Sequence, residues 1–527
     1  MRKNNLIKFG KIGLSPAGLS KISMRKLLLS VLFVLPLFAV AQNNYYNDGV
    51  KALREKDYKS AENYFNMSLA INPNNADAYN YRGLTKGEAG DYKGAMDDLT
   101  KLISLNPKSA DAYSSRAHIE ILMDYYNSAV SDCNQAIFLN PSSDVAYNNR
   151  GEAEYNLGKY DAAIADFTKA IELNPKNADA YVNRGKSKMA QKSYDGAVVD
   201  YDKAMDINPD LAVAYINRAI LRKTIHDQSG AFADADKAVA IAPKFENAYT
   251  TRGDIKVDQD DTVGAMADYN QAITLNPRYA DAWLGRGKLK LRFKDTTGAD
   301  SDDNNAVALR PNYSMAYYSR GDVKNMLNDV DGAIADLTTS INLNPRYAPA
   351  YHDRGLARTR KQDSIGAFND MNKAIELDPK FTVAYYNRAW MEEGLKKYDA
   401  AAADWSMVTK LAPNYPGTYY ALGYLYMNTG KPEVAIIYFN KVLSLDPYDT
   451  RSLSCRGECK KMINDLPGAM TDLNQAITYD AKMPQPYIYR AQVRYLLGDK
   501  LNACADWQKA ASLGDAKAKA DVNKYCK

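Results

Sequence analysis

Twelve prolines in this chain recur every 34 residues, without one insertion or deletion between them. They are Pro73, Pro107, Pro141, Pro175, Pro209, Pro243, Pro277, Pro311, Pro345, Pro379, Pro413 and Pro447. A fixed period of this length is typical of a stacked array, in which each unit has an apolar face that only its neighbours can cover. We therefore expect function to reside on an extended surface rather than in an enclosed catalytic cleft.

Counting back from the prolines divides residues 42–517 into fourteen windows, within which we number the places from 1 to 34. The windows are 42–75, 76–109, 110–143, 144–177, 178–211, 212–245, 246–279, 280–313, 314–347, 348–381, 382–415, 416–449, 450–483 and 484–517. Window 144–177 indicates two short amphipathic helices, because apolar residues recur at helical spacing on both sides of a turn at Gly158. Pro175 ends the second helix, since proline cannot continue the hydrogen-bond ladder.

Two places in every window hold small residues. Place 20 is always alanine, as in Ala163, and place 8 is always glycine or alanine, as in Gly151. The twelfth window carries a complete motif in Tyr419, Leu422, Gly423, Tyr426, Ala435, Phe439 and Pro447. This motif resembles the tetratricopeptide repeat. The resemblance implies an all-α, right-handed α-solenoid of about fourteen helix-turn-helix units, with a C-terminal capping helix that ends within 518–527.

An arginine and an aspartate occur together in twelve of the fourteen windows, at places 7 and 23. Examples are Arg150 with Asp166 and Arg184 with Asp200. The first and twelfth windows lack both, with Asp48, Tyr64, Leu422 and Tyr438 at these places. Because the two residues are gained and lost together within one window, we expect them to pair within a repeat, bidentately. The alternative is a basic ladder that binds an acidic ligand.

Residues 1–41 lie outside the repeat pattern. Arg25 and Lys26 precede an apolar run that ends at Ala39–Ala41, which is typical of a secretory signal peptide. We expect translation to start at Met24 and cleavage to follow Ala41, at the first place of the first window. The resemblance to secreted bacterial repeat proteins then implies an exported protein of the periplasm, the cell envelope or the medium of a bacterium.

Removal of this segment changes the charge of the chain. Residues 1–41 contain seven Lys or Arg and no acidic residue, so the formal net charge falls from +5 to −2. A basic face for nucleic acid is therefore not expected. No later stretch reaches transmembrane length, so we expect no membrane-spanning segment in the mature chain.

Five cysteines are present, an odd number for an exported protein. The placement of Cys504 in the last helix B and Cys526 at the chain end resembles that of other secreted bacterial repeat proteins, and it implies a disulfide that fixes the cap. Cys455 and Cys459 lie one helical turn apart, but no histidine or further cysteine pair is near them in sequence. We predict no metal site.

Catalytic motifs are not found. The three histidines lie in three different repeats, none with a partner at metal-ligand spacing, and no phosphate-binding loop, nucleophile elbow or dinucleotide fingerprint occurs. We therefore predict a protein without enzymatic activity and without a cofactor.

Asp303 stands at place 24, where a large apolar residue is expected. A carboxylate at this core place predicts either a hinge or a tolerated defect in the eighth window.

The resemblance further implies a concave groove lined by helix A, chiefly at places 2, 5, 9 and 12. In the ninth to twelfth windows these places hold Tyr318, His352, Tyr386, Trp390, Tyr420 and Tyr424. A cluster of exposed aromatic side chains predicts the footprint of a protein or peptide partner. Two alternatives remain open: packing between repeats covers these rings, or they bind an envelope glycan or polymer by stacking on sugar rings.

Overall fold

The computed structural model describes residues 44–526, which form fourteen helix pairs followed by one extra helix and contain no strand. The first helix A covers 44–54 of the described residues. The other A helices are α3 (Ala76–Glu88), α5 (Ala110–Leu122), α7 (Asp144–Asn156), α9 (Ala178–Ala190), α11 (Ala212–Thr224), α13 (Glu246–Asp258), α15 (Ala280–Arg292), α17 (Ser314–Met326), α19 (Ala348–Arg360), α21 (Thr382–Gly394), α23 (Pro416–Asn428), α25 (Thr450–Met462) and α27 (Pro484–Leu496). The predicted signal segment lies outside the described residues.

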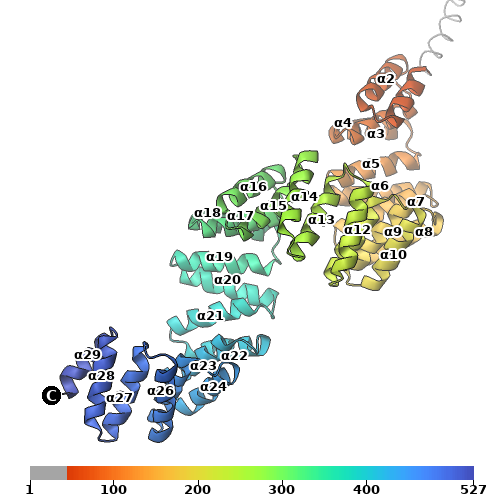
Figure 1. Ribbon diagram of the computed structural model, residues 1–527. Helices are drawn as coiled ribbons and strands as arrows, with labels where there is room; N and C mark the ends of the chain where they lie inside the picture. The colour runs from red at the N-terminus through yellow and green to blue at the C-terminus, as the bar shows by residue number, and fades with distance from the viewer. Residues whose placement is uncertain (1–43, 527) are drawn as a thin grey trace, which may run out of the picture. The chain divides into compact units, whose positions relative to one another are not determined.

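Each B helix follows its A helix after a short turn (Figure 1). The B helices are α2 (Tyr58–Ile71), α4 (Tyr92–Leu105), α6 (Tyr126–Leu139), α8 (Tyr160–Leu173), α10 (Tyr194–Ile207), α12 (Gln228–Ile241), α14 (Thr262–Leu275), α16 (Thr296–Leu309), α18 (Val330–Leu343), α20 (Ser364–Leu377), α22 (Tyr398–Leu411), α24 (Pro432–Leu445), α26 (Leu466–Tyr479) and α28 (Lys500–Ser512). The extra helix is α29 (Ala516–Tyr525). The stacked array predicted from the proline spacing, and the all-α solenoid that the family resemblance implies, are thus confirmed.

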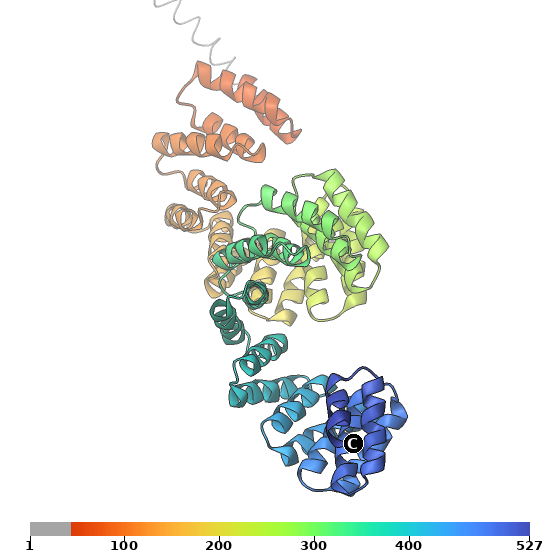
Figure 2. The ribbon, with the colours of Figure 1, turned by 90° about the vertical axis from the view of Figure 1, so that its left-hand side faces the viewer.

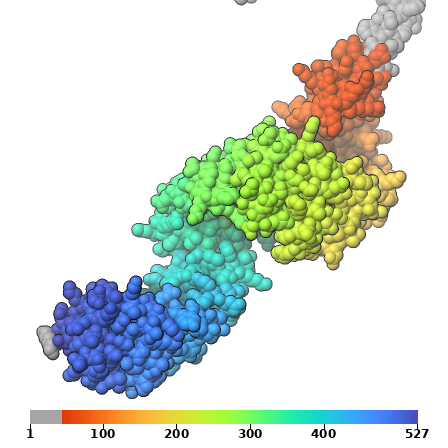
Figure 3. Space-filling model, in the orientation of Figure 1, coloured from red at the N-terminus to blue at the C-terminus, as the bar shows by residue number. Residues whose placement is uncertain are grey.

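The chain divides into two compact units, which we call unit 1 and unit 2. The division falls within α14, between Asp268 and Tyr269. Within each unit the helices pack against the next ones in chain order, as the ribbon shows from two sides (Figures 1 and 2). In the space-filling view the atoms of neighbouring repeats touch throughout the blue C-terminal repeats of unit 2 (Figure 3).

Local sequence signals set the helix ends. Many B helices begin after an aspartate that accepts a hydrogen bond from a backbone N–H of the first turn, such as Asp91 Oδ1 from Gly94 N at 3.0 Å. Place 15, in the turn between A and B, has a positive φ in every window, as at Gly158 with φ 75°. The residue before a repeat proline leaves the helical conformation, as at Asn72 with φ −130° and ψ 93°, so helix B ends there.

The small residues at places 8 and 20 let helices A and B approach closely. Ala163 is fully buried, and a Cβ added to Gly151 would lie 2.8 Å from the ring of Phe167. Phe167 stands at place 24, where most windows have a large apolar side chain that packs against the small residue at place 8. A larger residue at place 8 would therefore force this core side chain to move.

The structure brings the predicted arginine and aspartate together in all twelve windows that have them. Arg150 donates from Nε and Nη2 to the carboxylate of Asp166 at 2.7 and 2.6 Å. Arg184 donates in the same way to Asp200 at 3.0 and 2.7 Å. The carboxylates are buried, so each pair lies in a place of low dielectric.

The third guanidinium nitrogen binds the preceding repeat, which the sequence reasoning did not anticipate. Arg150 Nη1 donates to Asn134 Oδ1 at 2.7 Å, and Arg184 Nη1 donates to Thr168 Oγ1 at 3.1 Å. Eleven of the twelve guanidinium groups also lie over the aromatic ring at place 4 of their own repeat, as Arg150 does over Tyr147 at 5.4 Å; the exception is Arg456, whose window has Leu453 at this place. The arginines are therefore occupied in joining neighbouring repeats, which argues against a free basic ladder.

The two windows without the pair have other residues at places 7 and 23, which are Asp48 and Tyr64 in the first window. In the twelfth window Leu422 is buried in place of arginine, and the ring of Tyr438 stacks on Tyr426 at 5.6 Å. Burial raises the pKa of Tyr438, in keeping with its place against Tyr426.

The C-terminal helix α29 covers the last repeat. A disulfide joins Cys504 of α28 to Cys526, with the two Cα atoms 5.5 Å apart. Ala518 is fully buried, and Tyr525 stacks on Trp507 with ring centroids 5.3 Å apart. The cap therefore shields the apolar face that a further repeat would otherwise cover.

Candidate functional site

The six aromatic residues expected to line a groove lie on four consecutive A helices of unit 2, from α17 to α23. Four of them stand at place 5 and two at place 9 of their windows. The structure separates these two sets by exposure, because the place-5 side chains turn toward the neighbouring repeat. Only the place-9 side chains are exposed.

His352, one of the six residues predicted to line the groove, is buried, with 7% of its surface exposed. Its Nδ1 lies 2.7 Å from Asp353 Oδ1, and its Nε2 lies 2.8 Å from the Asn387 amide nitrogen of the next repeat. Its ring also contacts Phe381. Nδ1 thus binds within α19, whereas Nε2 joins α19 to α21.

The other place-5 residues, Tyr318, Tyr386 and Tyr420, are half-buried between repeats. Tyr386 packs edge-on against Trp405 with ring centroids 4.9 Å apart. Burial raises the pKa of Tyr420, whose hydroxyl lies 3.8 Å from Cys455 Sγ. Packing within the repeat thus covers part of the Tyr386 ring, and a contact with the next repeat covers part of the Tyr420 ring.

Trp390 and Tyr424 stand at place 9 and are 49% and 42% exposed. Beneath them lie supporting rings: Trp390 packs edge-on against Trp405 at 5.4 Å, and Tyr424 stacks on Tyr420 at 6.1 Å. Trp405 is itself fixed, because its Nε1 donates to Glu393 at 2.6 Å. The two exposed rings are therefore held on a rigid layer.

Leu356 extends this exposed surface and was missed, because the sequence analysis singled out aromatic residues alone. It stands at place 9 of the tenth window and is 37% exposed. We call Leu356, Trp390 and Tyr424 the place-9 row. The same place holds Asp322 before the row and Glu458 after it, so an apolar strip lies between two carboxylates. Burial, together with Asp353, raises the pKa of Asp322.

The free thiols have no arrangement suited to metal binding. Cys133, Cys455 and Cys459 are buried. Burial raises the pKa of Cys455 to about 11 and that of Cys459 to about 12, which disfavours the thiolate that a metal requires. Across residues 44–526 no three His, Cys, Asp or Glu side chains form a group that could hold a metal ion.

The helices of this described part were also compared with the requirements of a membrane span. None of them combines the length and the apolarity needed to cross a bilayer.

Tetratricopeptide-repeat family models match the chain at residues 51–120, 145–177, 178–211 and 416–449, and a TPR-repeat model matches 253–292. The chain carries tetratricopeptide repeats. Repeats of this type are typical of scaffolds for protein–protein interaction and are generally non-enzymatic. No curated protein matches the sequence.

The chain is also similar in fold to solved structures. A crystal structure of the APC/C hetero-tetramer Cut9-Hcn1 aligns over 94% of this chain and 99% of its own, with a TM-score of 0.53 and 16% identity. A tetratricopeptide repeat protein from Parabacteroides merdae covers 48% of this chain and 99% of its own, with a TM-score of 0.41 and 22% identity. MamA protein covers 32% of this chain and 92% of its own, with a TM-score of 0.28 and 26% identity.

Proposed function

We propose that this chain is an exported scaffold whose place-9 row binds a segment of a partner protein. The observation that carries the proposal is the exposure of Leu356, Trp390 and Tyr424 at equivalent places of three consecutive A helices. Tryptophan and tyrosine dominate interface hot spots because they bury much area with few rotatable bonds. An extended segment or an amphipathic helix can present apolar anchors that contact such a strip.

Two features support export from a bacterial cytoplasm. The charged and apolar sequence before Ala41 is typical of a signal peptide. The Cys504–Cys526 disulfide is of a kind that persists in oxidising compartments and is rare in the cytosol. The periplasm, the cell envelope and the medium are the compartments consistent with both.

A glycan or another envelope polymer is the second candidate ligand. It is favoured by one observation, the exposure of two aromatic rings, Trp390 and Tyr424, at equivalent places of neighbouring repeats. Exposed rings of this kind can stack on sugars as well as on side chains. A protein partner is preferred because Leu356, an aliphatic residue, continues the same row.

The test replaces Leu356 with a photoreactive benzoyl-phenylalanine and crosslinks the full chain in envelope extract of the native organism. We expect a crosslinked adduct that disappears when the extract is treated with protease. Trp390→Ala should abolish the adduct. Ile437→Ala is the matched control, since Ile437 is 65% exposed on helix B of a neighbouring repeat, and it should leave the adduct unchanged.

Two results would refute the protein-binding role of the row. One is an adduct that survives protease but is lost after glycosidase treatment, which together with binding on a glycan array would establish the sugar ligand. The other is equal crosslinking in Trp390→Ala and Ile437→Ala, which would show that the row does not recognise the partner.

A further inference from the structure

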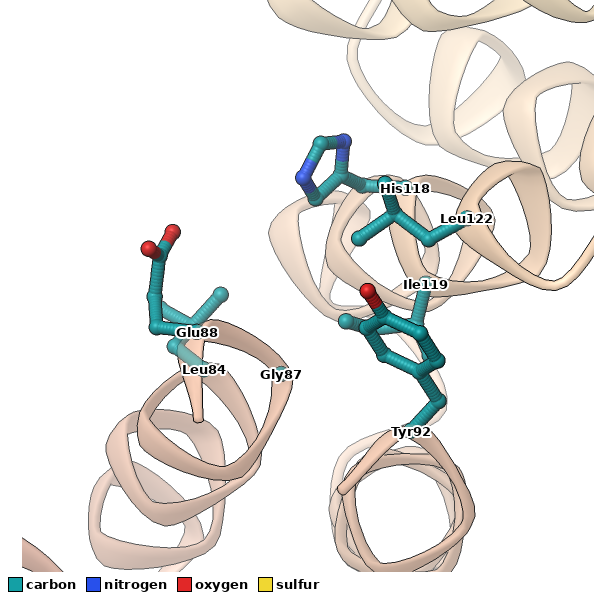
Figure 4. A pocket seen from close by; sticks show the side chains of 7 residues that line it. All are labelled: Leu84, Gly87, Glu88, Tyr92, His118, Ile119 and Leu122. Atoms are coloured by element: carbon teal, nitrogen blue, oxygen red, sulfur yellow. The ribbon is translucent and has the colours of Figure 1, made fainter. Parts of the chain in front are cut away.

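Unit 1 contains a cavity of about 260 Å³ between the A helices of the second and third windows (Figure 4). It is lined by Leu84, Gly87, Glu88, Tyr92, His118, Ile119 and Leu122. The close-up shows Glu88 on one side of the opening and His118 on the other, while the Tyr92 hydroxyl points into the space between them. The apolar side chains come from α3 and α5.

Gly87 is the reason that this space is open. It stands at place 12, and it is the only glycine at that place among the fourteen windows. A Cβ added to Gly87 would lie 2.5 Å from Ile119 Cδ1, so Ile119 occupies the base of the slot. The cavity is the remaining volume above Ile119, toward Tyr92 and His118.

The fourth window shows what fills the equivalent slot elsewhere in unit 1. There Tyr155 stands at place 12, and its ring packs against Tyr160 with centroids 5.6 Å apart. Lys186 of the next repeat places its Nζ over the same ring, 5.1 Å from the centroid. Burial raises the pKa of Tyr155, in keeping with its enclosed position.

The second and third windows keep two of these partners but lack the ring. Tyr92 stands at the place of Tyr160, and His118 stands at the place of Lys186. In place of Tyr155 the chain has Gly87. The slot therefore keeps residues at the two places that contact the ring in the fourth window. It lacks the ring itself.

The rim of the slot adds a charge preference. Glu88 is exposed and forms no ion pair among the described residues, while the nearby Lys86 is paired with Asp98 at 2.9 Å. Asp91 and Asp124 also lie close in sequence, and each carboxylate accepts a hydrogen bond from an uncharged group rather than from a cation. Among the residues that line the slot, Glu88 is therefore the one carboxylate, and a basic group is complementary to it.

We propose that this slot binds an aromatic side chain of a partner segment, next to a lysine or arginine that pairs with Glu88. The ring occupies the volume that Tyr155 fills in the fourth window, with Tyr92 at its edge and His118 over its face. Leu84 and Leu122 contact its sides. All of these residues belong to unit 1, so the slot and the place-9 row of unit 2 are tested independently.

The test is a methyl NMR titration of the full chain with two dipeptide probes, N-acetyl-lysyl-tyrosinamide and N-acetyl-glutamyl-tyrosinamide. We expect the lysyl probe to shift the Ile119 δ1 methyl upfield in a saturable manner, because an aromatic ring lies above it. Nuclear Overhauser effects should join the tyrosine ring to the Leu84 and Leu122 methyl groups. The glutamyl probe should bind about two- to fivefold more weakly, as expected for one exposed ion pair.

Variants locate the site. Gly87→Tyr combined with Ile119→Ser rebuilds the filled slot of the fourth window and should abolish the shifts of Leu84 and Leu122. His118→Ala should weaken binding, whereas Lys186→Ala, at the same place of a window whose slot is filled, should not. The proposal is overturned if the wild-type chain shows no Overhauser effects from the probe to these leucines, or if the filled variant binds as the wild type does.

Discussion

Asp303 should make the stability of unit 2 depend on pH, and the effect can be calculated from its surroundings. The residue is fully buried at place 24, where Phe167 and Leu337 stand in other windows. Neither carboxyl oxygen has a hydrogen bond of standard geometry, although the hydroxyl of Ser319 lies close by. Burial raises the pKa of Asp303 from 3.8 to about 7.

The sign follows from the direction of this shift. Because the folded-state pKa lies above the unfolded-state value, the folded protein keeps the proton between pH 3.8 and about 7. The favourable contribution is complete below pH 3.8 and is lost as pH rises through 7. At about 1.4 kcal/mol per pH unit, the loss is about 4 kcal/mol in all and about 3 kcal/mol between pH 5 and pH 8.

Other charged groups face Asp303 and modify this loss of free energy. Lys288 of α15 favours the ionised form, while Asp300 and Asp302 of α16 disfavour it. Asp302 is itself paired with Arg286 and Lys290, so its own repulsion is reduced. Desolvation is the largest cause, and the direction of the pH effect therefore holds.

The assay compares the wild type with Asp303→Leu by hydrogen exchange of α16 at pH 5 and pH 8, corrected for intrinsic exchange rates. Leucine is the residue that the ninth window has at this place, so the variant should pack and should not titrate. We expect the wild type to lose about 3 kcal/mol of local stability relative to the variant over this range. Leu337→Asp is the reciprocal control and should introduce the same dependence in the ninth window. An equal pH dependence in wild type and Asp303→Leu would refute the reasoning.

Three further substitutions test the packing between helices. Asp166→Asn leaves the partly buried Arg150 without its charge partner, and thermal melting with hydrogen exchange of α8 should show a loss of about 3–5 kcal/mol. Changing both Cys504 and Cys526 to serine should destabilise the C-terminal repeat by about 3 kcal/mol in the same assay, since the bridge closes a loop over 22 residues. Glu392→Lys should stabilise the eleventh window by about 1–2 kcal/mol, because Glu392 is buried beside Asp404 where most windows have a cation at this place. Unchanged stability in any one of them would contradict the interaction assigned to that residue.

The helix pairs could be predicted because their signals are local and repeated. Proline fixes where helix B ends, and α8 accordingly ends at Leu173, two residues before Pro175. The arginine–aspartate pairing was also visible within one window. The end of helix B and the arginine–aspartate pairing are both encoded within one repeat. Their recurrence in successive windows therefore makes both patterns easy to recognise.

The bond between repeats was harder to find, because it joins places in two different windows. Place 25 is Asn, Thr or Asp wherever an arginine follows in the next window, as at Asn134 before Arg150. It is Ser406 before Leu422, where no arginine follows. The signal was present in the sequence, but it appears only when each window is read against its neighbour.

Exposure could not be predicted from residue type. His352 and Trp390 are both large and both on helix A, yet His352 is buried and Trp390 is half-exposed. The difference lies in direction: place 5 faces the next A helix and place 9 faces outward. That direction depends on the packing angle of neighbouring repeats, which no single window encodes.

Because all repeats share one register, residues at the same place in different windows can be compared directly. This comparison separates residues that serve binding from residues that serve packing. Asp303 and Gly87 each depart from what most windows have at the same place. Asp303 departs at a core place, where the change lowers the stability of the repeat and leaves its surface unaltered. Gly87 departs at a place that borders the exposed face of helix A, where the loss of a side chain opens a slot while the core residues Ala95 and Leu99 stay fully buried. We therefore expect a departure on the exposed face to bear on recognition, and one in the core to bear on stability.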